Sequence, residues 1–447
     1  MHRVLLIDEI LRGVFEHIDG DVDVDRQPIR YTFASLARVC QAWRDPALDF
    51  LWRFQHSTDP LFSLIPGAVL KENTTSFDGD ISPESLAKFF SYASRVRTVA
   101  HHSRTFTKLS PAVLTLLRAH HSEHTLLPAL TSVRLILRDA ARRHIPPTLY
   151  LSGRLRDVSI DISFISPKAG DAVTHPGEAL CAYLDEVARV ATGLQHLRLR
   201  GRICERMAET VATMAGLRTL SLCVGGDLTP RALSAIASFP YLEDLRIQLD
   251  GMDAGALAEA LHPCSSSAAQ IFPSLQVFRV RSAPSIVEVL FGHLSTSNIL
   301  HTLHLESDFK PRPVDDWIPA FTLLASKTHA TLTSLSIESL SSFCEVPDHA
   351  FPPKLHFTLD TLRPLARLAR LEHFSIDPSV PADLSDADLA ALARWFPAIA
   401  SLGLWTHPVD AFDAPAYFSL QPRATAASLA AFATHCPRLR ELALPMD

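Results

Sequence analysis

The stretch FPYLEDLRI, residues 239–247, contains a pattern that the chain repeats many times. Its core is an apolar residue, two variable residues, an apolar residue, one variable residue and a final apolar residue. Eleven clear copies start 23 to 40 residues apart, at residues 130, 155, 194, 217, 242, 275, 300, 332, 371, 399 and 439. A weaker copy covers residues 96–101. Because the last three letters alternate with a period of two, each copy predicts a short strand with its apolar residues on one side.

The segments between the copies carry apolar residues three and four positions apart, which is typical of amphipathic helices. Residues 179–192, 232–239 and 386–396 are examples. A proline often precedes the strand pattern, and it helps to end the helix because the residue before proline disfavours the helical conformation. One strand and one helix cannot bury both their faces alone, but stacked copies can. The sequence therefore predicts an α/β solenoid with a parallel sheet inside, helices outside and right-handed crossovers that curve it.

This pattern resembles leucine-rich repeats of the irregular, helix-bearing kind, and the resemblance covers residues 96–447. The Asn or Cys that usually follows the strand in that family is mostly missing, which leaves the repeat subclass open. The alternative is a doubly wound α/β domain whose strands only look alike. That alternative is disfavoured because no Gly-rich phosphate loop follows any strand.

The first fifty residues carry a different pattern, with three expected helices. Residues 5–19 place apolar side chains at helical spacing, with two acidic residues in the first turn, where the helix dipole favours them. A second stripe and a third one follow, and Pro46 is expected to separate their helices. The stripes are Leu6, Ile7, Ile10, Leu11, Val14, Phe15 and Ile18; then Leu36, Val39, Cys40 and Trp43; then Leu48, Leu51 and Trp52. So short a segment makes a poor core alone, so we expect its apolar faces to need a partner.

This segment resembles an F-box. The matching residues are Glu9, Ile10, Phe15, Leu36, Val39, Cys40, Trp43, Arg44, Leu51 and Trp52. Two features depart from that family: Ile7 stands where a proline is usual, and the loop over residues 20–32 is long. The resemblance implies a three-helix F-box that binds the Skp-type adaptor of a cullin–RING ubiquitin ligase, while the following repeats hold a protein substrate. The implied adaptor-binding residues are Leu6, Ile7, Ile10, Leu11, Phe15, Val39, Trp43 and Trp52.

These patterns predict three parts: an F-box over residues 1–57, a linker or helical connection over 58–95, and a leucine-rich-repeat solenoid over 96–447. The implied function is that of a substrate-recognition subunit in a Skp–cullin–F-box ubiquitin ligase. The alternative is a non-catalytic repeat scaffold whose N-terminal helices only cap the solenoid.

Composition narrows the function classes further. The chain has 447 residues, of which 47% are hydrophobic and 20% charged, and its net charge of -6 argues against a general nucleic-acid binder. No apolar run is long enough to span a membrane. The seven cysteines are scattered and form no Cys-x-x-Cys pair, which favours reduced thiols in the cytoplasm, the nucleus or both.

Catalytic motifs are absent from the sequence, including those of serine hydrolases, P-loop nucleotide-binding proteins and zinc proteases. We therefore expect no enzymatic activity and no cofactor. His120 and His124 are four residues apart and could share one helix face, but no third ligand stands nearby, so we expect no metal site.

The variable residue between the last two apolar letters is expected to face the open side of the sheet. In the middle repeats several of these positions and their alternate neighbours are arginines, while later repeats carry Glu306, Glu338 and Asp377. Arginine binds carboxylate and phosphate groups through paired hydrogen bonds. The run therefore indicates a site for an acidic or phosphorylated substrate segment, and the alternative is a solvated basic face. The candidate substrate-binding residues are Arg198, Arg200, Arg246, Arg279 and Arg281.

Overall fold

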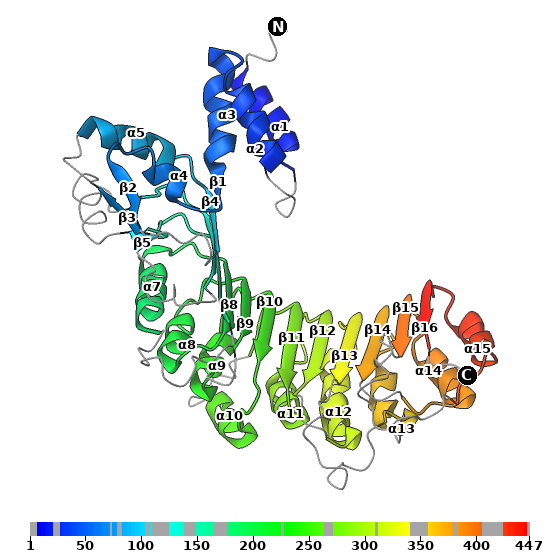
Figure 1. The fold of residues 1–447 in the computed structure, drawn as a ribbon. Helices are drawn as coiled ribbons and strands as arrows, with labels where there is room; N and C mark the ends of the chain where they lie inside the picture. The colour runs from blue at the N-terminus through cyan, green and yellow to red at the C-terminus, as the bar shows by residue number, and fades with distance from the viewer. Residues whose placement is uncertain are drawn as a thin grey trace. The chain divides into compact units, whose positions relative to one another are not determined.

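Two compact units make up the chain, Met1–Arg200 and Gly201–Asp447, and each is described by itself (Figure 1). The structure is a computed structural model. It describes residues 7–20, 27–71, 74–77, 83–102, 108–109, 125–137, 149–163, 177–224, 228–262, 271–308, 312–339, 356–378, 382–404 and 423–444. His120, His124 and Leu6 lie outside these residues.

The first unit begins with three helices, as the apolar stripes predicted: α1 (Asp8–Asp19), α2 (Gln27–Leu36) and α3 (Gln41–Arg53). Their boundaries differ from the expected ones. Pro46 lies inside α3 and does not end it. Pro46 is the sixth residue of α3, and because proline has no backbone N–H the helix lacks one backbone hydrogen bond there. The break falls earlier, in the turn at residues 37–39, so the expected second stripe belongs to two helices.

The rest of the first unit combines a parallel sheet with a small second sheet. The parallel strands follow the order β1-β4-β6-β7-β8, and the small sheet has the order β2-β3-β5. The elements are β1 (Phe54–Gln55), α4 (Asp59–Phe62), β2 (Ala68–Lys71), β3 (Thr74–Phe77), α5 (Pro83–Ala93), β4 (Thr98–His102), β5 (Lys108–Leu109), β6 (Ser132–Ile136), β7 (Asp157–Ser163), α7 (Gly177–Val190) and β8 (His196–Gly201).

The second unit alternates strands and helices throughout. Its strands β9 to β16 are neighbours in chain order, and each printed pair is parallel. The elements are α8 (Glu205–Val211), β9 (Thr219–Cys223), α9 (Pro230–Ala237), β10 (Asp244–Gln248), α10 (Ala254–Leu261), β11 (Val277–Ser282), α11 (Pro284–His293), β12 (Thr302–Ser307), η4 (Val314–Asp316), α12 (Trp317–Thr328), β13 (Ser334–Ser339), α13 (Leu359–Leu362), η6 (Arg363–Arg367), β14 (His373–Pro378), α14 (Asp386–Trp395), β15 (Ser401–Leu404), α15 (Ser428–His435) and β16 (Glu441–Ala443).

Every copy of the repeated pattern forms a strand, including the weak one, which is β4. In β9 to β15 none of the three apolar letters is more than 2% exposed, so these letters form the core. Neighbouring strands align letter on letter; Leu220, for example, is the register partner of Leu245. The helices of the second unit lie along one face of its sheet (Figure 1). We call the other face the inner face. The predicted α/β solenoid of the leucine-rich-repeat type is confirmed.

A buried asparagine joins two repeats of the second unit. Asn298 is 7% exposed and precedes β12. Its Nδ2 donates to the carbonyl oxygens of Ser295 at 2.7 Å and Lys327 at 2.8 Å. Its Oδ1 accepts from the amide of Leu300 at 3.2 Å and the hydroxyl of Thr331 at 3.3 Å. All polar atoms of the side chain are thus satisfied, and the carbonyl of Lys327 near the end of α12 gains a partner.

None of the helices in the described ranges combines the length and apolar character needed to cross a bilayer. The cysteines of these ranges are free thiols, namely Cys40, Cys181, Cys204, Cys223 and Cys436.

Candidate functional site

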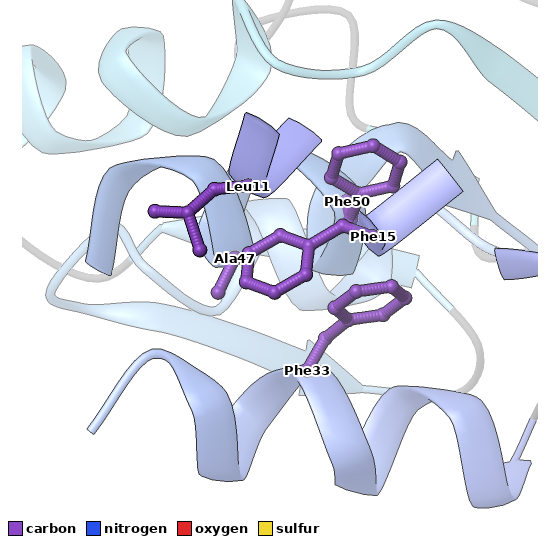
Figure 2. Packing of buried hydrophobic residues seen from close by; sticks show 5 residues of the cluster. All are labelled: Leu11, Phe15, Phe33, Ala47 and Phe50. Carbon is purple, nitrogen blue, oxygen red and sulfur yellow. The ribbon is translucent and has the colours of Figure 1, made fainter. Parts of the chain in front are cut away.

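The three N-terminal helices pack around a small aromatic core. Leu11 and Phe15 of α1 meet Phe33 of α2 and two residues of α3, Ala47 and Phe50 (Figure 2). Phe15 meets Phe33 edge-on, with ring centroids 5.6 Å apart, and Phe33 stacks on Phe50 at 5.3 Å. Offset and edge-on ring pairs of this kind add to the stabilisation that area burial alone provides. These residues therefore hold the helices together.

The side of α1 next to this core is apolar and partly exposed. Ile7, Ile10, Val14 and Ile18 are 45%, 38%, 42% and 38% exposed. Their spacing of three, four and four residues puts them on one side of the helix. We call these four residues the α1 stripe. Aliphatic residues that lie scattered on a surface need no explanation, but a continuous stripe indicates an interaction surface.

The expected adaptor-binding residues divide into two groups in the structure. Ile7 and Ile10 belong to the α1 stripe, and Val39 is 51% exposed in the turn between α2 and α3. Leu11 and Phe15 are 1% exposed, so their side chains serve the core of the helices. Their contribution to partner binding would be indirect, through the shape of the helical segment.

The two tryptophans of that set are half-buried. The ring of Trp43 meets Phe15 edge-on at 5.9 Å, and Trp52 packs on Tyr92 of α5 at 4.8 Å. The expected set omitted Val14 and Ile18, although their helical spacing from Ile7 was visible in the sequence. Whether the whole set binds an adaptor stays a prediction.

Ion pairs connect the helical segment to the rest of the first unit. Arg95, after α5, pairs with Asp45 at 2.9 Å and also with Asp49, both on α3. Arg12 of α1 reaches the other oxygen of Asp49 at 2.8 Å and Asp8 at 2.7 Å. Because Arg95 is only partly exposed, this network is less screened than isolated surface pairs are. The helices are thus held against the first repeat.

A second candidate surface is the inner face of the second unit. Arg246 of β10 is the register partner of Arg279 on β11, and Arg281 is the register partner of Glu306 on β12. Glu306 is in turn the register partner of Glu338 on β13, and Glu338 is the register partner of Asp377 on β14. These residues form one row across four strands, from Arg281 to Asp377. The row therefore changes from basic to acidic along neighbouring strands.

Acidic groups of the same unit bind two of the expected substrate-binding arginines. Arg279 contacts both carboxylate oxygens of Asp244, at 2.9 and 3.1 Å. Arg281 lies 3.2 Å from Asp250 and 3.5 Å from Glu306. Arg246 is exposed and has no ion pair with any residue of the described ranges. A negatively charged ligand would have to displace internal partners at Arg279 and Arg281 but not at Arg246.

The other two expected arginines lie on β8 of the first unit. Arg198 is exposed, and Arg200 lies 3.5 Å from Asp161 on β7. Three of the five arginines thus have acidic partners within the chain, which the repeat pattern did not reveal. Of these partners, Asp161 comes one residue after the repeated pattern, Asp250 comes three residues after it, and Asp244 stands at one of its free positions. The site itself stays a prediction.

Glu306 is a carboxyl group of the inner face with a shifted pKa. Burial raises its pKa above the ordinary value, and the neighbouring charge of Glu338 adds to the rise, although Arg281 acts in the opposite direction. His304 Nε2 lies 3.3 Å from a carboxylate oxygen of Glu338. A histidine and two glutamates thus meet on two adjacent strands.

Comparison with known proteins gives only distant likenesses. No known family profile matches the chain, and no curated protein sequence matches it. The leucine-rich-repeat-containing protein LegL7 of Legionella pneumophila is similar over 64% of this chain and 88% of its own, with 14% identity and a TM-score of 0.35. An internalin of Listeria monocytogenes is similar over 81% of this chain and 89% of its own, with 13% identity and a TM-score of 0.36. A chain of the Rad7 and Elc1 complex of yeast is similar over 94% of this chain and 92% of its own, with 12% identity and a TM-score of 0.33.

Proposed function

We propose that this chain is the substrate-recognition subunit of a Skp–cullin–F-box ubiquitin ligase. Its N-terminal helices would bind the Skp-type adaptor through the α1 stripe and Val39, and its repeats would bind a protein substrate. The chemistry of ubiquitin transfer would belong to the partners. The observation that carries the proposal is the α1 stripe itself, because its aliphatic side chains lie on the side of α1 that the helical core leaves open.

Two further features support an F-box. Trp43 and Leu51, which match that family's pattern, pack against the core of the three helices. The core is small, with five fully enclosed residues, so the helices leave much apolar surface outside it. Full burial of one large aliphatic side chain stabilises a complex by about 1.5–3 kcal/mol. A partner that covers the α1 stripe would gain the share of this energy that corresponds to the exposed 38–45% of each of its four side chains.

The test is binding of the full chain to a purified Skp-type adaptor. The double variant Ile10→Ser/Val14→Ser should bind about 10-fold more weakly or worse, since a partner would cover the exposed 38% and 42% of these side chains, roughly 0.6 kcal/mol or more for each. A matched control is Ile299→Ser/Leu429→Ser, which removes side chains of similar exposure, 48% and 40%, from the second unit. The control should bind like the wild type. Equal affinity of both double variants would refute the assignment of the α1 stripe.

A second function has its own supporting observation. The ion pairs of Arg95 with Asp45 and Asp49 hold the helices against the first repeat, as a structural cap would require. In that case the chain is a non-catalytic interaction scaffold with no link to a ligase. The same experiment separates the two functions, because a cap predicts no adaptor binding by the wild-type chain.

The proposed substrate is a segment with clustered negative charge, either acidic or phosphorylated. On the second unit its first contact would be Arg246, whose side chain has no internal acidic partner in the described ranges. Arg198 would make an equivalent contact on the first unit. Capture of substrates by the wild type should weaken with added salt, and capture by Arg198→Ala and Arg246→Ala should fall. The matched control is Arg279→Ala, which removes a side chain already bound to Asp244.

A further inference from the structure

A group of three metal-ligating side chains lies on the inner face of the second unit. His304 and Glu306 stand on β12, and Glu338 stands on the neighbouring β13. One ligand atom from each residue lies within 4.8 Å of the other two. Among the residues that the structure describes, no other group of three histidine, cysteine or acidic side chains comes together this closely. The three side chains are half-buried, on strands whose backbone is fixed by the parallel ladder.

The charges of this group are only partly balanced by the chain itself: Arg281, His304 and Arg246 act against the charge of Glu306, and the neighbouring Glu338 adds to it. Glu306 and Glu338 are direct register partners on adjacent strands, and Asp377 follows at the same register position on β14. Side chains in such a parallel pair start about 4.8 Å apart, and like charges placed opposite each other destabilise a sheet. Arg281 contacts Glu306 at 3.5 Å but is also bound to Asp250 at 3.2 Å. A further cation would therefore stabilise this part of the sheet.

We propose that His304 Nε2 and one carboxylate oxygen each of Glu306 and Glu338 bind a divalent transition-metal ion, with Zn²⁺ the ion that fits best. An imidazole nitrogen favours Zn²⁺ over Mg²⁺ and Ca²⁺, which prefer oxygen ligands alone. One imidazole and two carboxylates make three protein ligands, and such a set leaves a fourth position open. The imidazole distinguishes this group from an ordinary acidic patch.

Small side-chain movements are enough to form the site. Zinc–ligand bonds of about 2.0–2.2 Å require the ligand atoms to lie about 3.5 Å apart. His304 Nε2 and the nearer oxygen of Glu338 are already 3.3 Å apart. Glu306 has to turn one oxygen towards them, and its other oxygen can stay near Arg281. Since Arg281 also binds Asp250, it keeps an acidic partner when Glu306 turns.

The ion would have two effects on the molecule. It would connect β12 to β13 and hence two neighbouring repeats, which repeat arrays otherwise join only by stacking and backbone hydrogen bonds. It would also neutralise the negative charges of Glu306 and Glu338. Its fourth coordination position would stay open to a ligand on the inner face. This inference does not depend on a link to a ubiquitin ligase, because it concerns the second unit alone.

The test measures Zn²⁺ binding to the full-length chain, freed of metal with a chelator, by equilibrium dialysis and by calorimetry. Loss of a residue that only supports a metal ligand costs about 10–100-fold in affinity, so loss of a ligand should cost more than about 100-fold. We expect His304→Ala and Glu338→Gln each to remove one equivalent of bound Zn²⁺. Unfolding curves without metal establish that both variants are folded.

Two control variants test whether other histidines bind the metal, since the chain has 21 histidines in all. His373→Ala removes an exposed histidine from β14, and His120→Ala/His124→Ala removes the pair noted in the sequence. Both should keep the equivalent that His304→Ala loses. The proposal is overturned if the wild type binds no Zn²⁺ when the metal is in excess over the protein, if the equivalent survives in His304→Ala/Glu338→Gln, or if Mg²⁺ competes equally with Zn²⁺.

Discussion

The N-terminal helices and the repeats of the second unit use apolar residues in opposite ways. In the helices a core of five residues is enclosed while four aliphatic side chains of α1 remain exposed. In β9 to β15 every apolar letter of the pattern is buried and the inner face carries charged and polar groups. Each repeat covers the apolar side of the next one in the stack. Three helices, in contrast, cannot cover every apolar side of one another. The comparison shows that exposure of an apolar residue depends on the architecture around it more than on its type.

The largest expected effect is the loss of Phe15, since the helical core is small. Phe15→Ala should lower the free energy of unfolding of the helical segment by about 3–5 kcal/mol, because Phe15 contacts Phe33, Trp43 and Phe50. Trp43 fluorescence during urea unfolding reports on this segment. Phe15→Leu is the control and should lose less. A loss below about 1 kcal/mol for the alanine variant would show that the helices do not depend on this core.

The corresponding change in the repeats is Leu220→Ala or Leu245→Ala. Both residues are 0% exposed and are register partners, so each change should cost about 2–5 kcal/mol. Because repeats are stabilised by their nearest neighbours, hydrogen exchange should increase first in β9 and β10. Unchanged thermal stability in both variants would contradict the register of these strands.

Asn298 tests whether a polar residue can matter as much as an apolar letter in the repeats. Asn298→Ala should cost about 1–3 kcal/mol, because the carbonyl of Lys327 and the amide of Leu300 each lose a buried partner. Thermal unfolding measures the loss. Asn298→Asp is the second variant, because it keeps the acceptor for the amide of Leu300 but loses the donor to the carbonyl of Lys327. If both variants lose no more stability than a surface substitution does, Asn298 has no structural role.

The smallest expected effect is that of Ile10→Ser/Val14→Ser on stability. Exposed substitutions usually change the free energy of unfolding by about 0.5 kcal/mol or less. The double variant should therefore unfold like the wild type, even though it should lose adaptor binding. A loss comparable with that of Phe15→Ala would mean that the α1 stripe is covered by the chain itself, and the contrast between the two regions would fail.

The sequence predicts the repeats well because the information is local. The alternation within each copy determines which residues are buried, and the register repeats that choice on every strand, as Leu220 and Leu245 illustrate. The helical segment is harder, because the apolar residues of α1 form one wide stripe and the spacing alone does not tell which edge of it faces the other helices. These residues are Ile10, Leu11, Val14, Phe15 and Ile18. For that reason Leu11 and Phe15 were grouped with the exposed Ile7 and Ile10.

The inner face could be predicted in composition but not in its contacts. The run of arginines is visible in the sequence, but the ion pairs depend on residues such as Asp250, which lies outside the repeated pattern. The same holds for His304 and Glu338, which are 34 positions apart in the sequence and meet only because their strands align in register. Similarly, Pro46 suggested a helix end, whereas its place near the first turn of α3 allows the helix to continue.

The letter-on-letter register has a consequence for how such a chain could diverge. Each repeat of the second unit contributes one residue to each row of the inner face, and the buried letters of the same strand are separate positions. A substitution at an inner-face position such as Arg246 therefore alters one place on the surface without changing the volume of the core. Recognition can drift one repeat at a time while the requirements of stability stay constant. Related chains would then be expected to share their apolar letters and differ in the rows between them.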